Sequence, residues 1–316
     1  MNSLQNLLEL AQVLKIEYIN ITKTGSWGTC SVGYIESSLT STELNINEVN
    51  INVNDLHIFI KNKEFALTSD NNKILGKAGR SKAEFTVLNI DADKPKQREF
   101  KKEVTIPQDI IKSLSLCNKS DSRFYTHGAG YAENMIAISN GLALVFSKCD
   151  TVFNNIIPIQ AMQLSDKYNK NIKITEDDSF CSVECDGNLV ILGMITGGFP
   201  PFSRAMPQTI NYAVSVSSKE LREILTTAQQ FYTKEGIVKL TFKNNTLFIE
   251  TGFGSSKKYT SELECSYAHN NELEISFKLE SLLKLASLRD ETDFLIESPE
   301  KPVKIGENAL ITTARI

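Results

Sequence analysis

The sequence has few of the residues, and none of the short motifs, from which common catalytic and metal centres are built. Its 316 residues include three histidines, His57, His127 and His269, far apart along the chain, and six cysteines without a CxxC pair. It contains no G-x-x-x-x-G-K-[ST] phosphate loop, no H-E-x-x-H pair and no G-x-S-x-G elbow. We therefore expect no metal, no cofactor and no enzymatic activity. An enzyme whose site is assembled only in three dimensions remains an alternative.

Long apolar runs and a signal sequence are missing as well. No apolar run approaches the roughly 20 residues of a membrane-spanning helix. The opening "MNSLQNLLELAQVLK" lacks a basic start and carries Glu9 within its apolar stretch. The scattered cysteines indicate no disulfide framework. These features favour a cytoplasmic protein without a membrane partner.

The chain also lacks an excess of positive charge. Its 34 lysines and arginines face 38 aspartates and glutamates, for a formal net charge of −4. This balance argues against a protein that binds nucleic acid through its whole surface. It leaves room for a protein that gathers its cations in one place.

Six segments carry apolar residues at helical spacing. In the first, Leu4, Leu7, Leu8, Ala11 and Leu14 form one stripe, and the fifth opens with a capping box. The segments recur every 50 to 60 residues or so, which indicates six similar units. The predicted helices cover or begin at residues 3–15, 54–63, 106–117, 157–168, 217–231 and 278–290.

Short runs of alternating apolar and polar residues lie between these helices, as is typical of antiparallel strands. The clearest hairpin is "TFKNNTLFIE", because Asn244 and Asn245 tolerate the positive φ of a tight turn. Asp186 and Gly187 mark a second hairpin. We expect an α+β fold with helices covering one side of antiparallel sheets whose edges meet neighbouring units. Paired units give three domains, at residues 1–95, 104–207 and 208–316, with a linker at 96–103.

A segment rich in glycine, proline and phenylalanine, "GGFPPFSRAMP" at residues 197–207, is too stiff for a flexible linker. It has the form G-x-F-P-x-aromatic-x-R-x-x-P, carried by Gly197, Phe199, Pro200, Phe202, Arg204 and Pro207. Together with "KAGRSKAEFTVLNI" (77–90), "VTIPQDIIKSL" (104–114) and the closing "TTARI", it resembles the bacterial or phage DNA sliding clamp, the beta subunit of DNA polymerase III.

This resemblance implies the DNA-clamp fold: three tandem domains, each made of two helix-plus-antiparallel-strand units, with the helices lining a ring. In the family, two chains join head to tail, and the homodimer encloses duplex DNA without reading its sequence. The implied function is that of a processivity factor, which tethers the replicative DNA polymerase and the clamp loader through short linear motifs. The ring would act in the cytoplasm, at the nucleoid. A short first domain and a Lys-, Asn- and Ile-rich composition are compatible with a phage or an AT-rich genome.

The polar faces of the predicted helices and one hairpin tip supply candidate cations for DNA. Enclosure of the duplex needs only weak phosphate contacts, so a net acidic chain can serve if its helices carry the cations. Acidic residues such as Glu9, Glu223 and Glu280 share these faces, and any single lysine is equally compatible with an ordinary solvated surface. The DNA-facing candidates are Lys15, Lys61, Lys63, Arg80, Lys82, Lys112, Lys167, Lys170, Lys219, Arg222, Lys284 and Arg289.

The resemblance also implies a pocket for partner peptides, formed by residues 197–207, the closing residues and "SNGLAL" at 139–144. The family has T-D-G-H-R-L at the last of these places, whereas Leu142 and Ala143 stand here at the His and Arg positions. Thr313 and Ala314 likewise replace Pro and Met. We expect a more apolar pocket with its own preferred motif, unless these residues only close a domain junction. The candidates are Gly141, Leu142, Leu144, Pro200, Arg204, Leu310, Ile311, Arg315 and Ile316.

The altered pocket keeps a second function open. A clamp-fold homologue could act as a scaffold for one partner, or be an inactive variant, and tether no polymerase.

Overall fold

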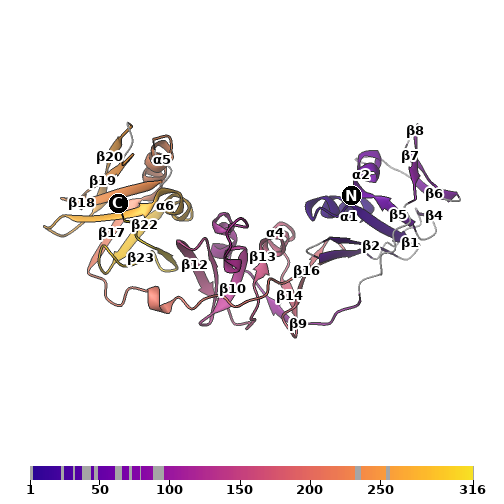
Figure 1. Cartoon of the computed structure of the whole chain (residues 1–316), viewed down its shortest axis with the longest axis horizontal. Coiled ribbons are helices and arrows are strands. Elements are labelled where there is room, and N and C mark those ends of the chain that lie inside the picture. The colour runs from indigo at the N-terminus through magenta and orange to yellow at the C-terminus, as the bar shows by residue number, and fades with distance from the viewer. Residues whose placement is uncertain are drawn as a thin grey trace. The chain divides into compact units, whose positions relative to one another are not determined.

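The structure is a computed structural model that describes residues 3–22, 25–30, 33–37, 44–45, 49–60, 66–70, 73–78, 80–87, 96–231, 236–253 and 257–315. The chain forms two compact units. Unit 1 comprises Met1–Ile106 and Gln160–Met194, and unit 2 comprises Pro107–Ile159 and Ile195–Ile316. Both units combine helices with largely antiparallel sheets, which confirms the predicted α+β class (Figure 1).

The described residues of unit 1 form two sheets. The first is antiparallel throughout, in the order β5 (Val49–Asn52), β1 (Tyr18–Thr22), β2 (Gly25–Cys30), β3 (Gly33–Ser37), β16 (Asn188–Gly193), β15 (Phe180–Cys185), β14 (Ile172–Thr175) and β9 (Phe100–Val104). The second has the order β4 (Leu44–Asn45), β6 (Ala66–Asp70), β7 (Lys73–Ala78) and β8 (Ser81–Thr86), with β4 parallel to β6. Helices α1 (Ser3–Val13) and α2 (Val53–Ile60) pack against each other.

Unit 2 contains one twelve-stranded antiparallel sheet. Its order is β13 (Ile157–Pro158), β10 (Gly128–Ala132), β11 (Met135–Ser139), β12 (Ala143–Lys148), β24 (Ala309–Ile311), β23 (Val303–Ile305), β22 (Glu291–Ile296), β17 (Tyr212–Ser217), β20 (Tyr259–Ser266), β19 (Thr246–Thr251), β18 (Ile237–Lys243) and β21 (Leu273–Lys278). The longer helices of this unit, α5 (Ser218–Ala228) and α6 (Leu279–Ala286), lie side by side (Figure 1). Shorter helical segments are α3 (Gln108–Lys112) and the 3-10 turns η1 (Leu114–Leu116), η2 (Phe124–Thr126) and η3 (Ser203–Ala205). Helix α4 (Ile159–Tyr168) begins at the end of one segment of unit 2 and continues into unit 1.

The helices form where the apolar pattern places them. The five stripe residues of the first predicted helix are at most 4% exposed. In α5, the Oγ of Ser217 accepts a hydrogen bond from the backbone N–H of Glu220 at 3.4 Å, so one half of the predicted capping box is formed. Both predicted hairpin turns are confirmed, because Asn244, Asn245, Asp186 and Gly187 all have positive φ.

The helix predicted from residue 106 is much shorter than expected. It ends after the five residues of α3, and the chain continues as the 3-10 turn η1. The hydroxyl of Ser113 donates to the carbonyl of Asp109 at 2.5 Å, and Ser113 itself leaves the helical backbone conformation. A serine that bonds its own preceding turn competes with helix continuation. The second predicted helix ends at Ile60, and its last predicted residues, 61–63, lie outside the described residues.

Two strand pairings join segments far apart in the sequence. Strand β16 pairs with β3 in unit 1, with Val190 opposite Ile35. Strand β12 pairs with β24 in unit 2, with Leu144 opposite Leu310. Strands from distant parts of the chain therefore complete both sheets. Residues 100–103 of the predicted linker belong to β9, which pairs with β14, and the division into three domains stays a prediction.

Two kinds of feature are absent from the described residues. None of their helices is long and apolar enough to cross a membrane. Within the same residues, no group of three or more His, Cys, Asp or Glu side chains is arranged to hold a metal ion.

Candidate docking site

The segment at residues 199–206, called the wall segment below, is fixed by two buried aromatic rings. Phe199 and Phe202 are 7% and 8% exposed. The ring of Phe202 lies 5.2 Å from that of Phe146 between centroids, and the ring of Phe199 lies 5.8 Å from that of Tyr125. Burial of an aromatic side chain is among the largest single contributions to packing. The rings therefore anchor the wall segment to the sheet of unit 2.

Gly197 directs the chain into the wall segment. Its φ is +124°, a conformation that side chains rarely adopt, and a Cβ there would lie 2.5 Å from the ring of Phe124. Its N–H donates to the side-chain oxygen of Asn155 at 3.1 Å. A residue with a side chain would be strained at this position and would also displace the Phe124 ring.

An acidic residue that was not predicted from the sequence, Glu133, also binds the wall segment. The carboxylate of Glu133 accepts hydrogen bonds from the backbone N–H groups of Phe202 at 3.0 Å and Ser203 at 2.9 Å, and from the Ser203 hydroxyl at 2.5 Å. The Ser203 hydroxyl, followed by the two backbone donors, lowers the pKa of Glu133 below its usual value. Glu133 is in the turn between β10 and β11, with φ of 55°. No local sequence pattern marks Glu133, because its partners lie about 70 residues away along the chain.

Residues 139–144, called the polar turn below, are shaped by hydrogen bonds instead. The side-chain oxygen of Asn140 accepts from the N–H groups of Leu142 at 2.9 Å and Ala143 at 2.7 Å. The Ser139 hydroxyl donates to the carbonyl of Ala143 at 2.8 Å and accepts from the N–H of Gly141. Gly141 has φ of +81°, so the turn closes at a residue without a side chain.

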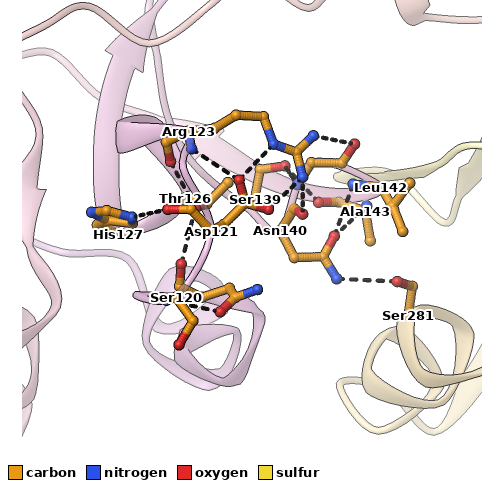
Figure 2. Close-up of polar contacts among 12 residues, drawn as sticks. Ser120, Asp121, Arg123, Thr126, His127, Ser139, Asn140, Leu142, Ala143 and Ser281 are labelled. Carbon is orange, nitrogen blue, oxygen red and sulfur yellow. Dashed lines mark hydrogen bonds and ion pairs between the residues drawn. The ribbon is translucent and has the colours of Figure 1, made fainter.

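Arg123 binds backbone carbonyl groups of the polar turn, as Figure 2 shows. Its guanidinium donates to the carbonyls of Asn140 at 3.2 Å and Gly141 at 3.5 Å, and forms a two-point ion pair with Asp121, at 2.6 and 2.8 Å. Hydrogen bonds from Arg123 hold the pKa of the Asp121 carboxyl well below its usual range. Asn140 then reaches the third part of the site, because its amide donates to the hydroxyl of Ser281 on α6 at 3.0 Å.

The closing residues of the chain run beside the polar turn. The N–H of Thr312 donates to the carbonyl of Leu142 at 2.8 Å, and the Thr312 hydroxyl donates to the same oxygen at 3.1 Å. Ala314 donates to the carbonyl of Ser276 at 2.7 Å. The 312–314 segment is therefore tied both to the polar turn and to β21.

The predicted peptide-binding residues fall into three groups. Leu144, Leu310 and Ile311 are buried, and the first two share a core cluster with Phe199 and Phe202. Gly141 is covered by Arg123, while Leu142 stays 38% exposed. Pro200, Arg204 and Arg315 are exposed, and within the described residues neither arginine forms a hydrogen bond or ion pair. Ile316 lies outside the described residues.

The structure therefore brings the wall segment, the polar turn and β24 together through buried side chains. The exposed members of the predicted site are Leu142, Pro200, Arg204 and Arg315. Arg123, Glu133 and Ser281 hydrogen-bond to these segments as well, and no local pattern in the sequence marks them.

Some of the predicted DNA-facing cations bind other groups of the protein, and others are exposed. Lys284 pairs with Glu280 at 2.8 Å, and the Nε of Arg222 donates to the carbonyl of Ser218 at 3.2 Å. Arg289 donates to the side chain of Asn308, which donates in turn to Asp109 at 2.7 Å. Lys112 and Arg289 line one cavity of about 500 Å³ in unit 2. The exposed candidates are Lys15, Arg80, Lys82, Lys112, Lys167, Lys170 and Lys219, whereas Lys61 and Lys63 lie outside the described residues.

These features define the class: the chain has the fold of the bacterial DNA sliding clamps. The beta subunit of DNA polymerase III from Pseudomonas aeruginosa superimposes with a TM-score of 0.81 at 16% identity, over 99% of this chain and 98% of that one. A DnaN sliding clamp from Bartonella birtlesii, solved with griselimycin, gives 0.80 at 16% identity, over 96% and 92% of the two chains. The C. crescentus beta sliding clamp gives 0.80 at 12% identity, over 99% and 97%. No protein-family model and no curated protein sequence matches the chain.

Proposed function

We propose that this protein is a DNA sliding clamp: a homodimeric ring that encloses duplex DNA and tethers replication proteins without catalysing a reaction. The observation that carries the proposal is the similarity of fold to solved sliding clamps over 99% of the chain, at a TM-score of 0.81. The likeness covers nearly the whole length of both chains, so it is not the match of one shared domain. A ring holds DNA by topology, so the charge balance of −4 is compatible with this function.

The partners that we propose are duplex DNA of any sequence, a second copy of the chain, and a replicative polymerase and clamp loader bound through short linear motifs. Support for the last comes from the wall segment, the polar turn and the residues after β24, which meet in unit 2. Exposed Leu142 and Pro200 offer apolar contact there, while Arg204 and Arg315 supply charge. The place of action that goes with these partners is the bacterial cytoplasm, at the nucleoid.

Ring closure is tested on DNA that has or lacks ends. We expect a dimer by light scattering, and retention on a nicked circular plasmid after incubation with a clamp loader. The matched control is the same plasmid cut once, from which a ring slides off. Equal retention on circular and linear DNA, or no retention in the presence of the loader, would contradict the clamp function.

Peptide docking is tested separately with a displayed library of random twelve-residue peptides, selected on the full chain. Peptides so selected should bind a chain lacking Arg315 and Ile316 at least about tenfold more weakly, since each good contact at such a site is worth about 1 to 2 kcal/mol. The particle mass should not change. A K301Q variant, which removes an exposed lysine paired with the less exposed Glu297 on unit 2, serves as the control. Unchanged binding after the truncation would show that these residues are not part of the docking site.

A second candidate, a clamp-fold scaffold that holds no polymerase on DNA, is favoured by one observation. The polar surfaces of α5 and α6 carry Lys219, Arg222 and Lys284, but equally Glu220, Glu223 and Glu280. These two helices therefore offer no net positive charge to a duplex. A dimer that captures peptides but is lost equally from circular and linear DNA would support this candidate.

A further inference from the structure

The polar turn contains the one place in the sequence where a glycine follows an asparagine, Asn140–Gly141. Asparagine is a chemically labile residue. A glycine after it raises its reactivity, because no side chain hinders the approach of the glycine nitrogen to the asparagine amide. The sequence therefore places a reactive pair inside the proposed docking site.

The reaction of such a pair is deamidation. The backbone nitrogen of Gly141 attacks Cγ of Asn140 and loses its proton, ammonia leaves, and a cyclic imide forms. Water then opens the ring to aspartate or to isoaspartate, so the net change consumes water and releases ammonia. In isoaspartate the main chain runs through the former side-chain carbonyl and is longer by a methylene group. The backbone of the turn is then changed permanently.

The folded turn holds the amide that would react. Its oxygen accepts hydrogen bonds from the N–H groups of Leu142 at 2.9 Å and Ala143 at 2.7 Å. Its nitrogen, the leaving group, donates to the hydroxyl of Ser281 at 3.0 Å, as Figure 2 shows. Ser281 is only 2% exposed. The amide is thus bound at both ends, and it turns toward the backbone of Gly141 only if these contacts are lost.

The attacking nitrogen is held as well. The N–H of Gly141 donates to the hydroxyl of Ser139 at 2.8 Å. That hydroxyl donates in turn to the carbonyl of Ala143 at 2.8 Å, which fixes its own position. Both reacting groups of the pair therefore take part in hydrogen bonds of the folded turn. Reaction requires a local opening of the turn, as in other exchange processes of native proteins.

A second turn of the chain offers the same glycine conformation in open surroundings. Gly187 has φ of +80°, against +81° for Gly141, and a Cβ on Gly187 would meet nothing within 4 Å. Asp186, which precedes it, is exposed. An asparagine at residue 186 would therefore stand before a comparable glycine, and this turn provides a matched reference.

We propose that Asn140 is a latent modification site: the hydrogen bonds of the polar turn suppress its deamidation, and opening of the turn leads to an irreversible change of the docking site. An aspartate at this position has no N–H to donate to Ser281, and isoaspartate lengthens the main chain within the turn. The chemistry at Asn140 goes beyond the docking function, and only its effect on peptide binding rests on that function.

The experiment follows deamidation in three proteins: wild type, S281A and D186N. Each is incubated in mildly alkaline buffer, folded or in urea, and digested at intervals. Mass spectrometry of the fragments measures the conversion of amide to acid at residue 140 and, in D186N, at residue 186. The two sites of D186N are compared within one chain, so buffer and time are identical for both.

In folded D186N, conversion at residue 140 should be at least about tenfold slower than at residue 186, because several hydrogen bonds must first be released. In urea the two sites should convert alike. S281A should speed conversion at residue 140 about fivefold, as for the loss of one hydrogen bond. Equal rates at the two sites of the folded protein would overturn the proposal. Faster conversion at residue 140 would overturn it too, since the N–H groups of Leu142 and Ala143 would then activate the amide.

The effect on docking is measured on the products. Deamidation adds a negative charge, so anion exchange separates modified from unmodified protein in one incubated sample of S281A. A peptide selected on the full chain should bind the modified fraction at least about tenfold more weakly. Equal binding to both fractions would refute the change of the docking site. If no peptide binds even the wild type, the docking function fails, while the rates at residues 140 and 186 still decide whether the turn protects Asn140.

Discussion

The wall segment and the polar turn face the same proposed site but are held in place by different forces. Phe199 and Phe202 fix the wall segment by burial, with Glu133 as one polar anchor. The polar turn contains exposed Leu142 and is shaped by hydrogen bonds that Ser139 and Arg123 donate and that the side-chain oxygen of Asn140 accepts. Burial gives a large, non-directional stabilisation, whereas hydrogen bonds fix direction at a smaller net gain. A docking site built in this way has one rigid side and one side whose shape depends on a few polar contacts.

The largest effect is expected for the rigid side. Phe202→Ala should destabilise unit 2 by about 3–5 kcal/mol, because it removes a buried ring from the cluster around Phe146. Urea unfolding followed by circular dichroism measures this loss. Phe248→Ala, at a ring 41% exposed on β19, is the matched control and should cost far less. Similar losses in both variants would show that the wall segment is not held by burial.

An intermediate effect is expected for the polar turn, where two glycines allow a clean comparison. Gly141 and Gly187 have φ of +81° and +80°, but a Cβ would meet the Arg123 guanidinium at 2.0 Å in the first and nothing within 4 Å in the second. Both alanine variants should lose about 1 kcal/mol to backbone strain. Gly141→Ala should lose about 1–2 kcal/mol more, because Arg123 must release its carbonyl acceptors.

Unfolding free energies of the two variants and of the wild type measure this difference. Peptide affinity should fall for Gly141→Ala alone, because Gly187 is in unit 1. Equal stabilities for the two variants would mean that Arg123 does not hold the polar turn.

The smallest effect is expected for the polar anchor of the wall segment. Glu133→Gln should cost less than about 1 kcal/mol, since the carboxylate is exposed and screened by solvent. Its folded-state pKa is lowered, so the stabilisation is fully present above the pKa of about 4.3 in the unfolded chain and is lost as pH falls through the folded pKa. Unfolding free energies of wild type and variant should thus differ at neutral pH and converge in acid. For Glu264→Gln, at an exposed residue of β20, we expect no comparable convergence, and a Glu133→Gln difference that persists in acid would refute the ionic anchor.

Local patterns were sufficient for much of the fold. The stripe of the first helix, the Ser217 cap and the turns at Asn244 and Asp186 are each decided by a few neighbouring residues. The shortening of α3 was not predictable in this way, because it depends on a side-chain hydrogen bond of Ser113. The pairing of β12 with β24 was not predictable from local patterns either. The partner of a strand depends on which other strand, distant in the sequence, folding brings beside it.

The residues of the candidate site also differ in whether neighbouring residues in the sequence are sufficient to predict them. Leu144 belongs to the matched SNGLAL motif and Leu310 lies just before the matched closing residues, and the structure places the two together in one core cluster. Arg123, Glu133 and Ser281 act on residues between 17 and 141 positions away, so no local pattern marks them.

The two long-range pairings also bear on how the chain reaches its fold. Residues 33–37 pair with 188–192, and residues 143–145 pair with 309–311, so both sheets are completed only after long stretches of intervening chain are made. Such pairings fold slowly, since the entropy of a long loop is lost before any contact is gained. During synthesis, the edges of β3 and β12 stay open to other chains until their partner strands appear. Aggregation of incomplete chains, rather than instability of the finished protein, is therefore the hazard that this topology brings to expression.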